Sequence, residues 1–191
     1  MTEPWLPIHT PRLILREFRE IDHDDVHAYG SDADVARFMD WGPNTPQDTR
    51  DALAIAFDAQ AAVPRADFGV AVVPLATGRV MGSIALHLRD RANRTAELGF
   101  CLHRDLWGQG LITEAALAIL DVGFRHLDLH RVFATCDVRN TGSYRVMEKV
   151  GMRREGCMRR DRQIKGAWRD TYLYALLAAD YPATSEPFRS N

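Results

Sequence analysis

Residues 110–128 constrain the fold more than any other part of this sequence. Placed on a helix, the polar residues Glu114, Asp121, Arg125 and Asp128 fall on one narrow stripe, and nearly every other position is apolar. A helix with so little polar surface is stable only when most of it is buried. We therefore expect this helix inside a domain, and 191 residues are enough for one domain with a real core.

Strands and helices alternate irregularly along the rest of the chain. Alternating or continuous apolar runs predict strands at residues 12–18, 68–73, 80–88, 95–103, 131–138, 152–163 and 168–177. Helical spacing and capping residues predict helices at residues 22–29, 33–39, 46–60, 110–128 and 140–150. Neighbouring strands joined by short turns indicate hairpins, so the pattern predicts a mixed α/β sheet rather than a doubly wound parallel one.

The sequence predicts one domain over residues 1–181 and a C-terminal tail over residues 182–191, because it contains no internal repeat or long Gly/Ser linker. No apolar run is long enough to cross a membrane, and the N-terminus lacks the features of a signal peptide. These observations predict a soluble, cytoplasmic protein with no membrane partner.

The charge is balanced in total but not along the chain. With 24 Lys+Arg against 26 Asp+Glu the formal charge is −2, which argues against a nucleic-acid partner. Residues 1–60 nevertheless carry a balance of −7, and residues 125–170 a balance of +6. Either the chain has two ligand-binding faces of opposite sign, or its solvated surfaces differ by chance.

Cysteine and histidine are too scattered to form a disulfide framework or a metal site. The sequence has 3 cysteines without C-x-x-C spacing, and its 7 histidines include two H-x-x-x-H pairs, His23 with His27 and His126 with His130, neither with paired cysteines nearby; we expect no metal. Cys136 lies on an apolar strand face with Val132 and Ala134, which indicates a core residue rather than an acyl carrier.

Two glycines, Gly108 and Gly110, precede the apolar helix. Glycines at a helix N-terminus let backbone N–H groups approach an anion, and the positive end of the helix favours phosphate. No Gly-Lys-Ser/Thr follows, so the turn is not a P-loop, and Thr113 replaces the third glycine of a dinucleotide fingerprint. A plain tight turn and a site for a phosphate-rich cofactor both remain open, and the basic segment after Arg125 favours the cofactor.

The segment Glu97-Leu-Gly-Phe-Cys-Leu-His-Arg-Asp-Leu-Trp-Gly-Gln-Gly-Leu-Ile-Thr-Glu-Ala resembles the acetyl-CoA signature of the GNAT superfamily of N-acetyltransferases. It is most similar to the RimJ/RimL-like branch, the ribosomal-protein N-terminal acetyltransferases. The resemblance covers about residues 10–180. Further matches in the family's order are Thr10-Pro-Arg-Leu-Ile-Leu-Arg16, Leu129-His-Arg-Val132, Asn140-Thr-Gly-Ser-Tyr-Arg-Val146, Glu148-Lys-Val-Gly-Met152 and Gly166-Ala-Trp-Arg-Asp170.

The resemblance implies a GNAT fold, with a mixed, mostly antiparallel sheet of about six to seven strands flanked by about four helices. Two central parallel strands, here around residues 98–102 and 134–138, are expected to splay apart and hold acetyl-CoA. Asp105 stands where the wider superfamily has Gln or Arg, so no side-chain phosphate contact is expected there. The resemblance assigns cofactor binding to Phe100, Leu102, Trp107, Gly108, Gln109, Gly110, Leu111, Ile112, Thr113 and Asn140.

Three residues are candidates for catalysis. Glu97 is placed to relay a proton from the acceptor amine, and an ion pair with a neighbouring arginine is the alternative. Ser143 matches a serine proposed to protonate the CoA sulfur, and its alternative role is to help Asn140 cap the following helix. Tyr144 is the second choice for that acid.

The expected activity is transfer of the acetyl group of acetyl-CoA to a primary amine, with the N-terminal α-amine of a protein or peptide as first choice. A small cationic amine, such as an aminoglycoside or polyamine, is the alternative, and the balance of −7 in residues 1–60 suits it. A CoA-binding sensor without turnover is the rival from another class.

Trp41 either lines the acceptor entrance or is a packing aromatic. The sequence leaves a homodimer open.

Overall fold

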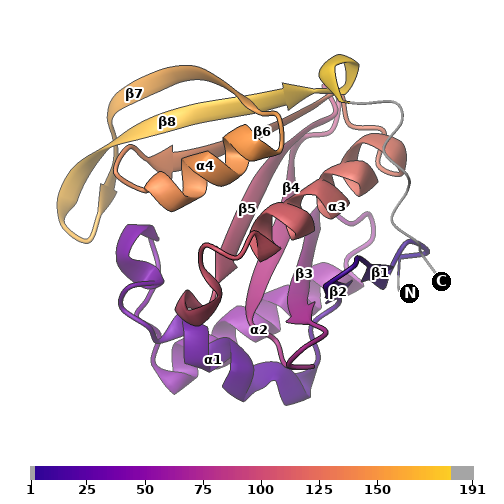
Figure 1. Cartoon of the computed structure of the whole chain (residues 1–191), viewed down its shortest axis with the longest axis vertical. Helices are drawn as coiled ribbons and strands as arrows, with labels where there is room; N and C mark the ends of the chain where they lie inside the picture. The colour runs from indigo at the N-terminus through magenta and orange to yellow at the C-terminus, as the bar shows by residue number, and fades with distance from the viewer. Residues whose placement is uncertain (1–2, 182–191) are drawn as a thin grey trace.

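Eight strands form one sheet in the computed structural model, which describes residues 3–181 (Figure 1). The order across the sheet is β1-β2-β3-β4-β5-β6-β8-β7, and every neighbouring pair is antiparallel except β5 and β6. The mixed, mostly antiparallel sheet is thereby confirmed. The strands are β1 (Ile8–His9), β2 (Leu13–Arg16), β3 (Asp67–Pro74), β4 (Gly82–Asp90), β5 (Thr95–Leu102), β6 (Arg131–Asp137), β7 (Arg153–Ile164) and β8 (Ala167–Leu177).

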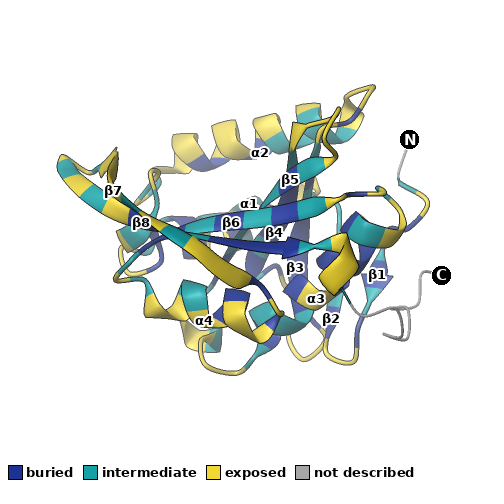
Figure 2. Ribbon diagram, turned by 90° about the horizontal axis from the view of Figure 1, so that it is seen from above, coloured by how far each residue is buried: buried dark blue, intermediate teal, exposed yellow. Residues whose placement is uncertain are grey.

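Two pairs of helices cover opposite faces of this sheet (Figure 2). They are α1 (His23–Gly30) and α2 (Pro46–Ala61) on one face, and α3 (Leu111–Arg125) and α4 (Thr141–Lys149) on the other. Each face has its own apolar cluster. Val26 and Leu53 pack with Cys101 on the α1–α2 side, whereas Ile119 and Met147 belong to the larger cluster on the α3–α4 side.

The apolar helix α3 is buried, as its composition predicts. Ala115, Ile119 and Leu120 have no exposed surface. Asp121 in its polar stripe is also buried, and its Oδ1 accepts a hydrogen bond of 2.6 Å from Arg125 Nε. The helix ends at Arg125 rather than at residue 128, because Asp128 takes a left-handed backbone conformation (φ 50°) that turns the chain toward β6.

Two further local features differ from what the sequence predicted. Residues 33–39 form only a 3-10 turn at Ala36–Phe38, because Met39 is already extended (ψ 154°) and Gly42-Pro43 follows. The two-residue strand β1 was not predicted, since it is too short to show a pattern. The predicted tail at residues 182–191 lies outside the described residues. No helix within residues 3–181 has the length and apolar character needed to span a membrane.

Candidate active site

The two parallel strands at the centre of the sheet separate soon after they begin. β5 and β6 pair only between residues Thr95–Glu97 and Arg131–Phe133, although β5 continues to Leu102 and β6 to Asp137. Beyond that point β5 stays paired with β4, and β6 stays paired with β8. Each strand is held by its outer neighbour while a gap opens between the two, which is the splayed arrangement that the resemblance implied.

A cleft of about 260 Å³ opens at this gap. Because side chains alternate along a strand, the cleft has two sides. Leu98 and Cys136 belong to the apolar cluster under α3 and α4. Glu97 and Gly99 are at the alternate positions of β5 and face the opposite side of the sheet. Residues from both sides line the cleft, so it passes through the sheet.

Two further segments cover the Glu97 side of the cleft. Residues 38–40 come from the turn before α2, and Arg162 and Ile164 come from the end of the β7–β8 hairpin. The Lys165 ammonium at the hairpin turn donates a hydrogen bond to the carbonyl oxygen of Ala36. This contact joins two segments that are far apart in the sequence.

The glycine turn leads directly into α3. Gly108 and Gly110 both have left-handed backbones (φ 75° and 76°), and no side chain caps the helix at Gly110. The first N–H groups of α3 are therefore left for another acceptor. A Cβ at Gly108 would meet nothing within 4 Å, so the space over the turn is open. Uncapped amides and open space fit a phosphate group.

Arg12 holds this turn in place and was missed by the sequence analysis. Its Nη1 donates to the Gln109 carbonyl oxygen at 2.9 Å, and its Nε lies 2.6 Å from Glu114 Oε2. Burial raises the pKa of Glu114, but hydrogen bonds from Thr10 and Arg12 outweigh it and hold that pKa below its ordinary value. Only the tertiary contact of β2 with α3 brings Arg12 to the turn, so no local pattern reveals it.

The other residues assigned to the cofactor are divided between core and surface. The side chains of Leu102 and Leu111 are buried in the core, which leaves only their backbone available to a ligand. Trp107 is exposed, and its Nε1 donates to the Leu102 carbonyl oxygen at 2.8 Å. Gln109 is also exposed, whereas Ile112 and Thr113 are half-buried at the start of α3.

Asn140 and Ser143 come together at the start of α4. Asn140 Oδ1 accepts a hydrogen bond of 3.2 Å from the Ser143 backbone N–H, as its predicted capping role requires. Both residues line the cleft, next to Phe100 on β5. The Ser143 hydroxyl also hydrogen-bonds Cys136, but burial dominates there and raises the pKa of that thiol to about 11. Cys136 therefore stays protonated at neutral pH and packs in the core, as expected.

Tyr144 and Trp41 are not among the residues that line the cleft. The Tyr144 ring packs edge-on against Tyr172, with 6.0 Å between the ring centroids, and contacts the apolar cluster. Trp41 is 36% exposed and follows directly after the segment that covers the cleft. The structure thus brings Glu97, Phe100, Asn140 and Ser143 to one cleft, and leaves these two aromatic residues outside it.

Glu97 lies in the cleft and also forms the ion pair that was its alternative role. Its Oε2 is 2.8 Å from Arg89 Nη2, and its Oε1 is 3.4 Å from the Thr135 hydroxyl. The Glu97 side chain is only 16% exposed. The carboxylate is therefore fixed in position at the point where β5 leaves β6.

His87 and Asp67 were also missed by the sequence analysis. His87 lines the cleft from β4, and its Nδ1 lies 2.7 Å from Asp67 Oδ2 on β3. The two residues are directly opposite in the β3–β4 register. The only signal in the sequence was the hairpin turn at residues 76–79, from which that register follows by counting.

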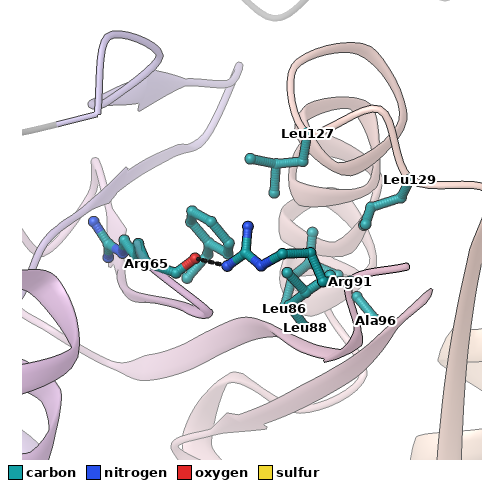
Figure 3. Close-up of a pocket in the computed structure, with 8 residues that line it drawn as sticks. Arg65, Leu86, Leu88, Arg91, Ala96, Leu127 and Leu129 are labelled. Atoms are coloured by element: carbon teal, nitrogen blue, oxygen red, sulfur yellow. Dashed lines mark hydrogen bonds between the residues drawn. The ribbon is translucent and has the colours of Figure 1, made fainter. Parts of the chain in front are cut away.

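A second cavity is lined by few groups that could take part in a reaction (Figure 3). Its volume is about 80 Å³, and its lining is mainly aliphatic. Arg91 reaches across it and donates to the Arg65 carbonyl oxygen at 3.0 Å. No carboxylate, hydroxyl or thiol lines this cavity. Over the described residues, no three His, Cys, Asp or Glu side chains are grouped as metal ligands would be.

Known proteins are similar to this chain in both sequence and fold. The chain is 34% identical over 174 residues to "Uncharacterized N-acetyltransferase YnaD" of Bacillus subtilis, covering 91% of this chain and 98% of the relative. A crystal structure of an acetyltransferase (GNAT family) from Bacillus anthracis is 35% identical, with a TM-score of 0.80, and covers 90% of this chain and 98% of that one.

More distant relatives have names that state an acceptor. The ribosomal-protein-serine acetyltransferase of Escherichia coli is 31% identical over 50% of this chain and 54% of its own length. The spermidine N(1)-acetyltransferase of Escherichia coli is 26% identical over 56% of this chain and 57% of its own length. The model of the family described as "Acetyltransferase (GNAT) domain" matches residues 12–153, and this chain is therefore a GNAT acetyltransferase.

Proposed function

We propose that this acetyltransferase transfers the acetyl group of acetyl-CoA to the N-terminal α-amine of a protein or peptide. The observation that carries the proposal is the cleft between β5 and β6, which opens to both faces of the sheet. A donor bound on the side of Phe100 and Ser143 and an acceptor bound on the side of Glu97 would meet at the gap.

On the donor side, the proposal assigns each part of acetyl-CoA to groups of this chain. Acetyl-CoA supplies an activated acetyl thioester. The uncapped amides at the start of α3, with the turn at Gly108 and Gly110, hold its phosphates, and the Asn140 side chain bonds its pantetheine arm. Backbone N–H groups near Phe100 stabilise the carbonyl oxygen, and the Ser143 hydroxyl gives a proton to the sulfur.

On the acceptor side, the charges support a single amine rather than a polycation. Several carboxylates of the acidic N-terminal segment are not free to bind a cation, because they pair with arginines: Asp22 with Arg16, Asp25 with Arg79 and Asp32 with Arg104. In the cleft, Asp40 and Glu97 are accompanied by Arg89 and Arg162, and the third carboxylate, Asp137, pairs with Arg139. A polyamine binds best where several negative charges are unpaired, and this balance disfavours it.

An α-amine also needs less help to lose its proton. At pH 7 a chain N-terminus with a pKa of ~7.8 is neutral in roughly one molecule of seven, whereas a lysine with a pKa of ~10.4 is neutral in about one of 2,500. A carboxylate fixed beside the gap, such as Glu97, is then sufficient as a proton relay.

A thiol-release assay with acetyl-CoA and a panel of amines tests the proposal. The panel contains a peptide with a free N-terminus and one lysine, the same peptide with a blocked N-terminus, spermidine and an aminoglycoside. We expect thiol release and mass gain only with the free N-terminus. Acetylation of spermidine or the aminoglycoside alone would show that the acceptor is a small amine. Tight acetyl-CoA binding without release for any amine would indicate a sensor.

A further inference from the structure

An aspartate and a histidine on neighbouring strands form a pair, of which the histidine lines the cleft. His87 Nδ1 lies 2.7 Å from Asp67 Oδ2. A carboxylate that accepts the proton on Nδ1 fixes the neutral imidazole in the tautomer whose Nε2 carries the lone pair. The pair therefore presents a basic nitrogen on the far side of the ring.

This nitrogen lies on the acceptor side of the cleft. His87 is directly opposite Glu97 in the β4–β5 register, so both side chains are on the same face of the sheet. Gly99 is on that face too, and a Cβ there would lie 3.5 Å from His87 Nε2. The absence of a side chain at Gly99 thus leaves Nε2 over bare backbone, beside the gap between β5 and β6.

The two candidate proton acceptors are engaged differently. Both carboxylate oxygens of Glu97 already have partners, Arg89 and Thr135. Within residues 3–181, by contrast, Nε2 of His87 makes no hydrogen bond. The His87 side chain is 32% exposed, so its ring can exchange a proton with water after each turnover. Glu97 is suited to attract an ammonium group, and His87 to take its proton.

We propose that His87, oriented by Asp67, accepts the proton of the acceptor ammonium; this inference rests on the proposed acetyl transfer. One N–H bond of the ammonium breaks, its electron pair stays on the acceptor nitrogen, and a new N–H bond forms at His87 Nε2. The imidazolium is stabilised by Asp67 and then gives its proton to water. His87 is a catalytic residue in this scheme, and Asp67 is a positioning residue.

The pH dependence of this step is set by the charged groups around the ring. They are Asp67 on β3, Glu97 on β5, Arg89 on β4, Asp137 on β6, and Asp40 and Arg162 on the two covering segments. Asp67 is the group in direct contact with the ring, so its replacement is the most selective test of the pair.

The first test compares His87→Gln with His126→Gln, a matched change at an exposed position past the end of α3. We measure kcat/KM from pH 6 to 9 with a free N-terminal peptide. His87→Gln is expected to lower the rate about a hundredfold at pH 6.5 and to approach the wild type above about pH 8.5, where neutral amine is abundant. Added imidazole is expected to rescue His87→Ala but not to affect His126→Gln.

The second test uses Asp67→Asn, which remains informative if a His87 variant does not fold. Loss of the negative neighbour makes the imidazolium formed in the reaction less stable, so kcat/KM should fall mainly at low pH and approach the wild type at high pH, as in His87→Gln. A purely structural Asp67 would lower the rate equally at every pH. That result, or a uniform loss of rate in His87→Gln with no imidazole rescue of His87→Ala, would overturn the role of His87. If the wild type itself releases no thiol with any amine, the proposed function fails as well.

Discussion

At the scale of single residues, Ser143 in the cleft makes two contacts within the chain and has one proposed chemical role. The Ser143 backbone N–H donates to Asn140, and its hydroxyl reaches the Cys136 thiol. Because that thiol is a weak partner, the hydroxyl can turn toward a ligand sulfur at little cost. Its neighbour Tyr144 is held in an edge-on contact with Tyr172 instead.

Ser143→Ala should therefore lower kcat about a hundredfold, which corresponds to ~2.7 kcal/mol of barrier, if Ser143 protonates the leaving thiolate. The acetyl-CoA dissociation constant should stay within a few-fold, because the turn proposed to bind the phosphates is elsewhere. Tyr144→Phe is the matched control and should retain nearly the full rate. Steady-state kinetics and calorimetry on both variants check this, and the reverse pattern would make Tyr144 the acid.

Glu97→Gln should reduce the rate mainly below about pH 7 and recover as the pH rises, because the carboxylate attracts the protonated acceptor and a neutral amine does not need it. Arg89→Gln is the control, since it breaks the same ion pair but keeps the carboxylate. The measurement is kcat/KM against pH for both variants. An equal, pH-independent loss in the two would show that Glu97 acts only through its ion pair.

At the scale of elements, the glycine turn and α3 act as one unit. Gly110 has a left-handed backbone, lies at the helix N-terminus, and is close to the Arg12 side chain. Any side chain at this position is strained and projects where a phosphate would approach.

Gly110→Val should abolish acetyl-CoA binding while the domain stays folded. Gly78→Val provides the control, because Gly78 has a similar backbone conformation (φ 64°) in the distant β3–β4 turn and no neighbour within 4 Å. It carries the same strain without touching the site. Calorimetry and circular dichroism on both variants are the measurements. Unchanged affinity in folded Gly110→Val would exclude the turn as the phosphate site.

Local signals predicted the elements that depend on local chemistry. The apolar composition of residues 110–128 predicted α3, Asn140 predicted the start of α4, and the sequence around Lys165 predicted the turn between β7 and β8. Local signals did not predict side-chain contacts that depend on how distant segments pack together. The pairing of His87 with Asp67 depends on strand register, and the position of Arg12 depends on packing between distant segments. The hairpin turn at residues 76–79 is an indirect signal of the first contact, and no local pattern indicates the second.

At the scale of the whole molecule, carboxylates paired in the folded state make stability depend on pH. The pKa values of Asp22, Glu114, Asp137 and Glu155 are lowered, each with an arginine among the causes. A lowered folded-state pKa contributes stability above the unfolded value and loses it as the pH falls through the folded value.

The free energy of unfolding should therefore be nearly constant from pH 7 to 5 and decrease below about pH 4. Urea unfolding at several pH values measures it. Glu114→Gln should cost on the order of 1 kcal/mol at pH 7 and flatten the acid dependence, because the contact with Arg12 loses its charge. Parallel curves for the variant and the wild type would contradict this.

The sheet is continuous across its width, but its two central strands, β5 and β6, are joined by a short ladder. Three residue pairs join β5 to β6, whereas six or more join each of the pairs β3–β4, β4–β5, β6–β8 and β7–β8. A force that pulls the halves apart would part the sheet there first, since a short ladder resists least. A ligand with its own amide groups that lies in the gap would link β5 to β6. The cleft thus also marks the weakest junction between the two halves of the sheet, and filling it is expected to stiffen the whole sheet.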